Sequence, residues 1–192
     1  MAVAGATLGD RAGLDVSGQL LHSLDSLNSG AALAYMLPLL AACYAGVAFA
    51  DRLEGFSQLR STFKAALIPQ LRILPFWGLG LLALGAGVGE ETLFRAFMQA
   101  ALCGGIAGAA PGLPEAATTA AGIAVASVIF GWLHALTPTY FFFATGAGAL
   151  FGVEYVLYGL PTAAATHFIY DWIALVFILR EWGGSSGAEE AG

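Results

Sequence analysis

Residues 31–50 read AALAYMLPLLAACYAGVAFA, and none of these twenty side chains carries a charge. A helix of about 20 residues crosses a bilayer, because each residue adds about 1.5 Å and the hydrocarbon core is about 30 Å thick. Pro38 is expected to kink this helix. The stretch therefore predicts a transmembrane helix and makes lipid the solvent for this part of the chain.

The composition extends this prediction to most of the chain. Of its 192 residues, 58% are hydrophobic and 10% are charged, whereas soluble domains carry about 25% charged residues. We therefore expect an all-α, polytopic transmembrane helix bundle of five or six spans, with the lipid bilayer as its surroundings. The net charge of -6, without a cluster of Lys and Arg, argues against a nucleic-acid partner.

The chain divides into three predicted segments, of which 31–182 is the membrane-embedded helical domain. Residues 1–30 are expected to be a polar N-terminal tail, and residues 183–192 a flexible C-terminal tail. Residues 51–72 hold four of the seven basic residues. By the positive-inside rule this connection faces the cytoplasm, which leaves the N-terminal tail outside.

The later spans follow from the apolar runs and their breaks. The run 73–103 is either one long tilted helix or two short spans that turn near residues 85–89, and 104–117 is rich in Gly, Pro and Ala and predicts a loop. The remaining predicted spans are 118–137, 139–158 and 162–179.

Few ionisable groups lie between residues 73 and 179: Glu90, Glu91, Arg95, Glu115, His134, Glu154, His167 and Asp171. A charged group at membrane depth costs at least a few kcal/mol, so such groups are kept where they face the bundle interior and perform a function. Apart from Glu115, which falls in the predicted loop, we expect them to surround a polar active-site cavity within the membrane.

The segment Glu90-Glu91-Thr92-Leu93-Phe94-Arg95 is expected to be helical, because no breaker interrupts it. Glu91 and Arg95 then share one face, whereas Glu90 points to an adjacent face. Arg95 can neutralise Glu91, which leaves Glu90 free to accept a proton from water. The alternative is that the three residues form an interfacial ion cluster at a helix end.

Two further clusters carry histidine. In Phe130-Gly131-Trp132-Leu133-His134 and in His167-Phe168-Ile169-Tyr170-Asp171, the first and last residues are four apart and share a helix face. A carboxylate beside His167 can fix its tautomer and orientation for catalysis or metal binding. A single membrane histidine, by contrast, is often just a packed core residue. Glu154 is expected either to pair with His167 across the hairpin at 159–161 or to line a cavity, in a supporting role.

Taken in order, EETLFR, FGWLH and HFIYD resemble the EExxxR, FxxxH and Hxxx(N/D) motifs of the CAAX protease and bacteriocin-processing family. This family of intramembrane endopeptidases includes the type II CAAX prenyl endopeptidases, and the resemblance covers residues 73–180. It implies that Glu90 is the principal base and that His134 positions or polarises the attacking water. Glu91 and Arg95 would stabilise this arrangement, and His167 with the residue four later would serve the tetrahedral intermediate or complete a metal site.

Asp171 departs from the prenyl endopeptidase pattern, which typically has Asn there. An ionised Asp cannot donate a hydrogen bond to an oxyanion, so we expect Asp171 to orient His167 or to bind a cation. No cofactor is assigned. Zinc or another divalent metal stays possible, although the sequence lacks the compact HExxH spacing.

A shared site also sets a geometric condition. If 139–158 crossed the whole membrane as a straight helix, His134 and His167 would lie on opposite sides. We therefore expect the helix that carries His134 to stop inside the membrane, at the break provided by Thr137-Pro138-Thr139.

These observations favour an intramembrane endopeptidase that cleaves membrane-associated protein or peptide substrates, for example in C-terminal sorting or maturation. The short, Ala- and Gly-rich chain is similar to bacterial members, which implies the bacterial inner membrane. The alternative is a non-catalytic membrane protein, either an immunity or peptide-binding protein or an ion or proton carrier.

Overall fold

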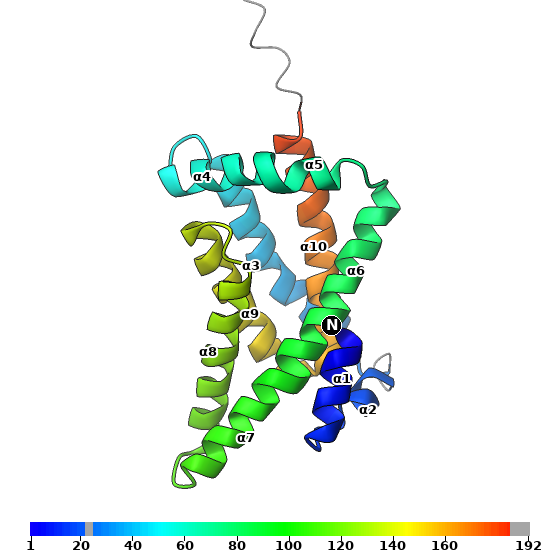
Figure 1. The fold of residues 1–192 in the computed structure, drawn as a ribbon, viewed down its shortest axis with the longest axis vertical. Coiled ribbons are helices and arrows are strands. Elements are labelled where there is room, and N and C mark those ends of the chain that lie inside the picture. Colours follow the sequence, from blue (N-terminus) through cyan, green and yellow to red (C-terminus); the bar gives the residue numbers. More distant parts are fainter. Residues whose placement is uncertain (22–24, 185–192) are drawn as a thin grey trace, which may run out of the picture.

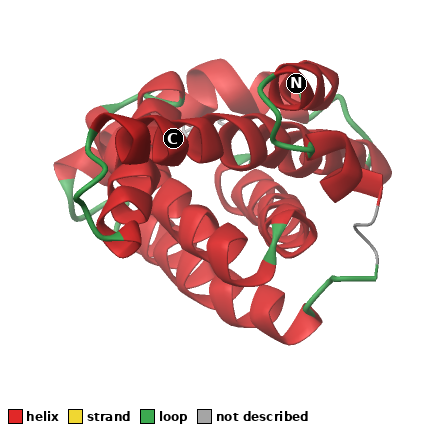
Figure 2. Ribbon diagram, turned by 90° about the horizontal axis from the view of Figure 1, so that it is seen from below, coloured by secondary structure: helices red, strands yellow, loops and turns green. Residues whose placement is uncertain are grey.

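The computed structural model of the chain describes residues 1–21 and 25–184, and all regular elements in these ranges are helices (Figures 1 and 2). In chain order they are α1 (Ala2–Arg11), α2 (Val16–Leu21), α3 (Ser29–Ala48), α4 (Glu54–Thr62), η1 (Phe63–Leu67), α5 (Ile68–Leu71), α6 (Phe76–Glu91), η2 (Thr92–Gln99), α7 (Ala100–Ala109), α8 (Glu115–Leu133), α9 (Pro138–Tyr158) and α10 (Leu160–Trp182). The segments η1 and η2 are π-helical. The prediction of an all-α fold is therefore confirmed.

The long helices run back and forth between the two ends of the molecule (Figure 1). Four of them, α3, α8, α9 and α10, are long and apolar enough to cross a membrane. The helical stretches Glu54–Leu71 and Phe76–Ala109 meet at a 110° bend, and if this pair is counted as one span the total is five. The chain is thus a polytopic helical bundle with four or five candidate spans, compared with the five or six expected.

The helix from Phe76 to Ala109 is continuous through α6, η2 and α7. This resolves the choice left open for 73–103 in favour of one long helix, and it shortens the loop expected at 104–117 to 110–114. The chain therefore does not turn at the glycines of residues 85–89. A Cβ at Gly87 would lie 2.8 Å from the carbonyl oxygen of Ala164, so glycine here permits α6 to pack closely against α10, as small residues do in membrane bundles.

Local signals set the helix ends around the site. At the start of α9, the Thr137 side chain accepts a hydrogen bond from the backbone N–H of Tyr140 at 3.1 Å, and Pro138 occupies the first turn, where its missing N–H costs nothing. At the other end, Gly159 has φ +83° and ψ 172°, a conformation that essentially only glycine adopts. This residue alone separates α9 from α10.

Helix α8 ends at Leu133, with His134 as its C-cap. In Figure 1 the α8–α9 connection lies below the layer formed by α4, η1 and α5, which runs across this end of the bundle. Phe63 of this layer packs against Tyr140 and Trp182. The chain thus turns back at the Thr137-Pro138 break, on the bundle side of the α4–α5 layer.

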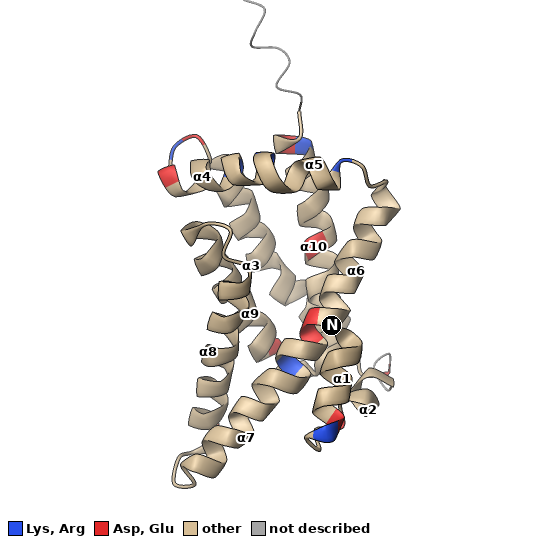
Figure 3. Ribbon diagram, viewed as in Figure 1, with Lys and Arg blue, Asp and Glu red and all other residues tan. Residues whose placement is uncertain are grey.

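Charge is distributed unevenly over the fold. Basic residues gather on the α4–α5 layer, while a second group of charged residues lies at the middle of the bundle (Figure 3). The expected N-terminal tail, over 1–30, contains the short helices α1 and α2 and the first two residues of α3. Val16 of α2 is fully buried in a cluster with Ala96 of η2 and Leu160 of α10. Most of the expected C-terminal tail, from residue 185 on, lies outside the described residues.

Candidate active site

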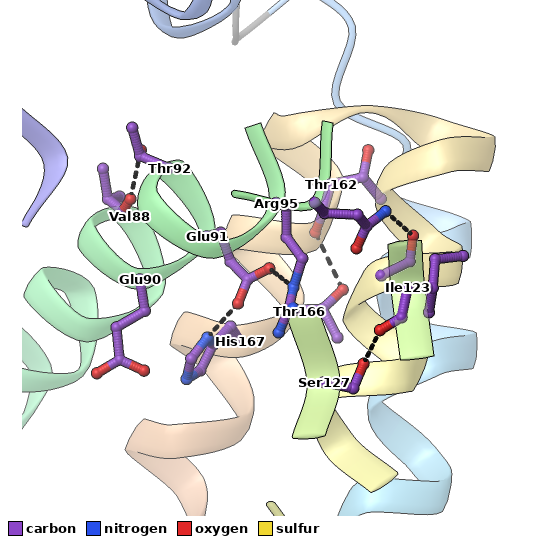
Figure 4. Close-up of polar contacts among 12 residues, drawn as sticks. Val88, Glu90, Glu91, Thr92, Arg95, Ile123, Ser127, Thr162, Thr166 and His167 are labelled. Carbon is purple, nitrogen blue, oxygen red and sulfur yellow. Dashed lines mark hydrogen bonds and ion pairs between the residues drawn. The ribbon is translucent and has the colours of Figure 1, made fainter. Parts of the chain in front are cut away.

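Glu91 is the centre of the charged group in the middle of the bundle. Neither Glu91 nor Arg95 has any side-chain exposure, and Arg95 Nε donates to Glu91 Oε2 at 3.0 Å. The other carboxylate oxygen, Oε1, lies 2.9 Å from His167 Nδ1 on α10. Figure 4 shows Glu91 between these two partners, with Glu90 pointing away from them. As the spacing predicted, Glu91 pairs with Arg95, and Glu90 points in a different direction.

The turns after Glu91 are wider than expected, because η2 is π-helical from Thr92 to Gln99. The Glu91–Arg95 pair still forms, and Gln99, four residues further, is also buried. Wide turns of this kind often lie at functional sites. The segment is helical as expected, but the sequence contains no breaker that marks the wide turns, and they were not predicted.

Glu90 has its partner on a different helix. Its Oε2 atom lies 3.4 Å from His134 Nε2, at the end of α8. The other ring nitrogen, Nδ1, lies 2.7 Å from the carbonyl oxygen of Phe130. Because a carbonyl can only accept, Nδ1 carries a hydrogen, and Nε2 is the atom that faces Glu90. Nε2 can then hold an ionised Glu90 only if it also carries a hydrogen, that is, if His134 is protonated.

His167 lies between two carboxylates. Its Nε2 atom is 3.3 Å from Asp171 Oδ2, and its Nδ1 atom faces Glu91. Asp171 therefore lies at the ring nitrogen through which its expected orienting role would act. Three carboxylates, one guanidinium and two imidazoles make up the group, so its charge sums to zero only if both histidines are protonated, and uncompensated buried charge is costly. In this arrangement, with zero net charge for the group, Glu90 is an ionised carboxylate.

Glu90, His134, His167 and Asp171 share one cavity of about 120 Å³. A water molecule needs about 10 to 15 Å³ of such space, so the cavity has room for water. The remaining walls come mostly from α8, α9 and α10: Phe130, Tyr140, Phe143, Ala144, Ala147, Phe151 and Tyr170. Four of the six predicted site residues thus line one cavity, and Glu91 and Arg95 are buried behind it.

Aromatic rings fix both imidazoles. Phe130 stacks on His134 with the ring centroids 4.2 Å apart, as its position four residues earlier predicts, and the Arg95 guanidinium lies 5.1 Å from the Phe130 ring centroid. Phe151 stacks on His167 at 4.5 Å. Phe151 was not predicted as a site residue, because nothing in its local sequence pattern separates it from the other apolar residues of α9.

Glu154 does not pair with His167, which was one of the two roles expected for it. It is fully buried on α9, and its Oε1 atom lies 2.5 Å from Thr166 Oγ1. It is also not part of the cavity wall. The reason is that Glu91 and Asp171 already occupy both ring nitrogens of His167.

The side chains present do not fit a metal ion. Within residues 1–21 and 25–184, no three His, Cys, Asp or Glu side chains converge as ligands of one ion. A tetrahedral zinc site needs ligand nitrogens with free lone pairs. Both nitrogens of His167 face carboxylates, and Nδ1 of His134 faces a backbone carbonyl.

Comparison with known proteins adds an independent line of evidence. The model of the family described as type II CAAX prenyl endopeptidase Rce1-like matches residues 72–173, more than half of the chain. This range includes the whole charged group from Glu90 to Asp171. No curated protein and no solved structure gave a significant match. The bundle of apolar helices and the family match together identify the chain as an integral membrane protein that belongs to the Rce1-like family of type II CAAX prenyl endopeptidases, a family of proteases.

Proposed function

We propose that this protein is an intramembrane endopeptidase in which Glu90 activates water. The observation that supports this most strongly is the meeting of Glu90 and His134, with 3.4 Å between Oε2 and Nε2, at a cavity with room for water. The 3.4 Å contact is an ion-pair distance without hydrogen-bond geometry, so the buried Oε2 atom of Glu90 has no hydrogen-bond partner among the described residues. A buried carboxylate oxygen without a hydrogen-bond partner is a strong acceptor for a water proton.

The reaction can be written with these residues. Water in the cavity donates a hydrogen bond to Glu90, and its oxygen attacks the carbonyl carbon of the substrate as Glu90 takes the proton. A carbon–oxygen bond forms, and the carbonyl oxygen becomes an oxyanion. Glu90 then gives its proton to the amide nitrogen, the carbon–nitrogen bond breaks, and an amine and a carboxylic acid leave. His134 Nε2 holds the Glu90 carboxylate in place.

The second imidazole supplies the positive charge. Protonated His167 would stabilise the oxyanion with its Nε2–H, which faces Asp171 in the resting site. Glu91 would hold the opposite nitrogen, and Arg95 would hold Glu91. The pair Glu91–Arg95 is thus expected to position His167 without touching the substrate.

The substrate is expected to be a membrane-associated protein or peptide, cleaved in C-terminal sorting or maturation, and the location to be the bacterial inner membrane. The surroundings of the cavity favour this over an ion or proton carrier. A neighbouring pocket of about 50 Å³ shares Tyr140, Phe143 and Tyr170 with the cavity, and apart from Thr139 and these tyrosines its lining is apolar. A carrier needs polar groups along its path, whereas an apolar pocket suits a substrate side chain.

The test is cleavage of co-expressed reporters in a bacterial membrane. Three reporters would carry a C-terminal apolar helix, a peptide precursor or a prenylated tail. We expect the wild type to process at least one, and Glu90→Gln and His134→Ala to lower the rate by about 10² to 10⁴, the usual contribution of general acid–base catalysis. Glu115→Gln is the matched control, because this acid is exposed at the start of α8.

The variants also separate the alternatives. Full processing by Glu90→Gln would end the mechanism proposed here. A protein that retains a reporter without cleaving it, equally well as wild type and as Glu90→Gln, would be a peptide-binding protein. Size-exclusion profiles of the purified variants show whether a loss of processing reflects a loss of fold.

A further inference from the structure

Glu154 is a buried acid that the proposed reaction does not use. Among the described residues, its Oε1 atom contacts Thr166 Oγ1 at 2.5 Å and its Oε2 atom has no hydrogen-bond partner. No cation lies within ion-pair distance of it in the described ranges, since the salt bridges found there involve other acids. A carboxylate in this position would be an uncompensated buried charge.

The hydrogen bonds around Thr166 indicate which partner donates. Besides Glu154, Thr166 Oγ1 lies 3.0 Å from the carbonyl oxygen of Thr162 and 3.4 Å from that of Ala32. Both carbonyls can only accept, and a hydroxyl has one hydrogen. If Glu154 were ionised, three acceptors would compete for that hydrogen. If Glu154 is a neutral acid, it donates to Thr166 Oγ1, and Thr166 donates to Thr162.

This contact joins α9 to α10 directly beside the site. Thr166 precedes His167 in the chain, and Glu154 lies three residues after Phe151, whose ring stacks on His167. The imidazole must meet Glu91 Oε1 at 2.9 Å and Asp171 Oδ2 at 3.3 Å at the same time. Asp171 lies on α10 with His167 and would move with it, but a shift of α10 would lengthen the contact to Glu91 on α6 and disturb the stack on Phe151 of α9.

We propose that Glu154 is a positioning residue, which as a neutral acid donates to Thr166, joins α9 to α10 and holds His167 against Phe151 and Glu91. The role of His167 in catalysis rests on the proposed function, whereas its position does not. The Glu154–Thr166 pair can therefore be tested without a substrate.

The first experiment observes the imidazole itself. The chain has three histidines, so a protein labelled with ¹⁵N only at histidine gives few imidazole signals, and the loss of one set in His167→Ala assigns that residue. We expect Glu154→Gln, whose amide can still donate to Thr166, to keep the ¹⁵N shifts of His167. Glu154→Leu and Thr166→Val should both move them, and the double variant should move them no further.

Two controls guard against a loss of fold. Thr118→Val removes a buried threonine hydroxyl that bonds only within α8, and it should leave the His167 signals unchanged. If Glu154→Leu does not fold, Glu154→Asp takes its place, because its shorter side chain keeps the acid but loses the contact. Unchanged His167 signals in folded Glu154→Leu, or in Glu154→Asp, together with Thr166→Val would overturn the proposal.

The second experiment measures cleavage of whichever reporter the wild type processes. Misplacement of a catalytic group by about 1 Å can cost about 100-fold in rate. We therefore expect Glu154→Leu and Thr166→Val to lower kcat by about 10- to 100-fold with KM unchanged, and Glu154→Gln to restore kcat. Equal loss in Glu154→Gln and Glu154→Leu would contradict the positioning role. If the wild type cleaves nothing, the proposed function fails, and the ¹⁵N shifts still decide on Glu154.

Discussion

Replacing Gly87 by alanine tests how closely α6 must approach α10. A Cβ at this position would lie 2.8 Å from both the Ala164 carbonyl oxygen and the backbone nitrogen of Phe168. Ordinary contact begins at 3.4 Å, about 0.6 Å further out. Both obstructing atoms belong to the backbone, so no side chain can move aside, and the helices themselves must separate.

The separation would act directly on the site. Glu91, four residues after Gly87, meets His167 with 2.9 Å between Oε1 and Nδ1, and an opening of about 0.6 Å would stretch this contact to the limit of a hydrogen bond. Overpacking costs about 1 to 3 kcal/mol. Alanine gains up to about 1 kcal/mol over glycine in a helix, so the steric cost is the larger of the two.

Gly85→Ala is the matched control, because it lies on the same helix and nothing lies within 4 Å of its added Cβ. We expect Gly87→Ala to unfold at a lower temperature in detergent micelles than Gly85→Ala, and to cleave the reporter at least about tenfold more slowly. Gly85→Ala should match or exceed the wild type in stability. If the two variants unfold and cleave alike, the close approach at Gly87 does not position the site.

Three further predictions concern stability, measured by thermal unfolding in the same micelles. Arg95→Met leaves the Glu91 carboxylate without its guanidinium and should cost about 3 to 5 kcal/mol; a double variant with Glu91→Gln should recover part of this loss, and no recovery would contradict the ion pair. Thr137→Val removes the side chain that caps α9 and should cost about 1 kcal/mol, whereas Thr137→Ser should stay near the wild type. Gly159→Ala forces a Cβ into a backbone conformation with φ +83° and should cost about 1 to 3 kcal/mol; an unchanged midpoint would show that the α9–α10 turn relaxes freely.

The sequence predicted the parts of this fold that depend on local signals. An uncharged run such as 31–50 has to be a membrane helix, and residues four apart, such as Phe130 and His134 or His167 and Asp171, have to share a face. These rules led to the all-helical bundle. The same spacing anticipated the Glu91–Arg95 pair and the different direction of Glu90.

Features that depend on tertiary packing were not predictable in this way. Nothing in the sequence near Glu91 shows that its second oxygen meets His167, 76 residues later. Glycines such as Gly87 can mark either a turn or a close helix contact, and only the neighbouring helix decides between them. The burial of Val16 was missed for a related reason: the segment 1–30 has no continuous apolar run, and Val16 finds its partners on η2 and α10.

The wide turns of η2 have a consequence for changes in the length of the long helix. A π-helical stretch has more residues per turn than an α-helix, so this part of the chain can lose a residue and become α-helical. On the N-terminal side of η2, α6 packs against α10, and on its C-terminal side, α7 packs against α8. Deleting Met98 would therefore convert the wide turns of η2 to α-helical turns and leave the contacts of α6 and α7 with their neighbouring helices in place. A deletion in the middle of α9, which is α-helical throughout, would instead rotate all later residues of that helix by about 100° and turn Glu154 away from Thr166.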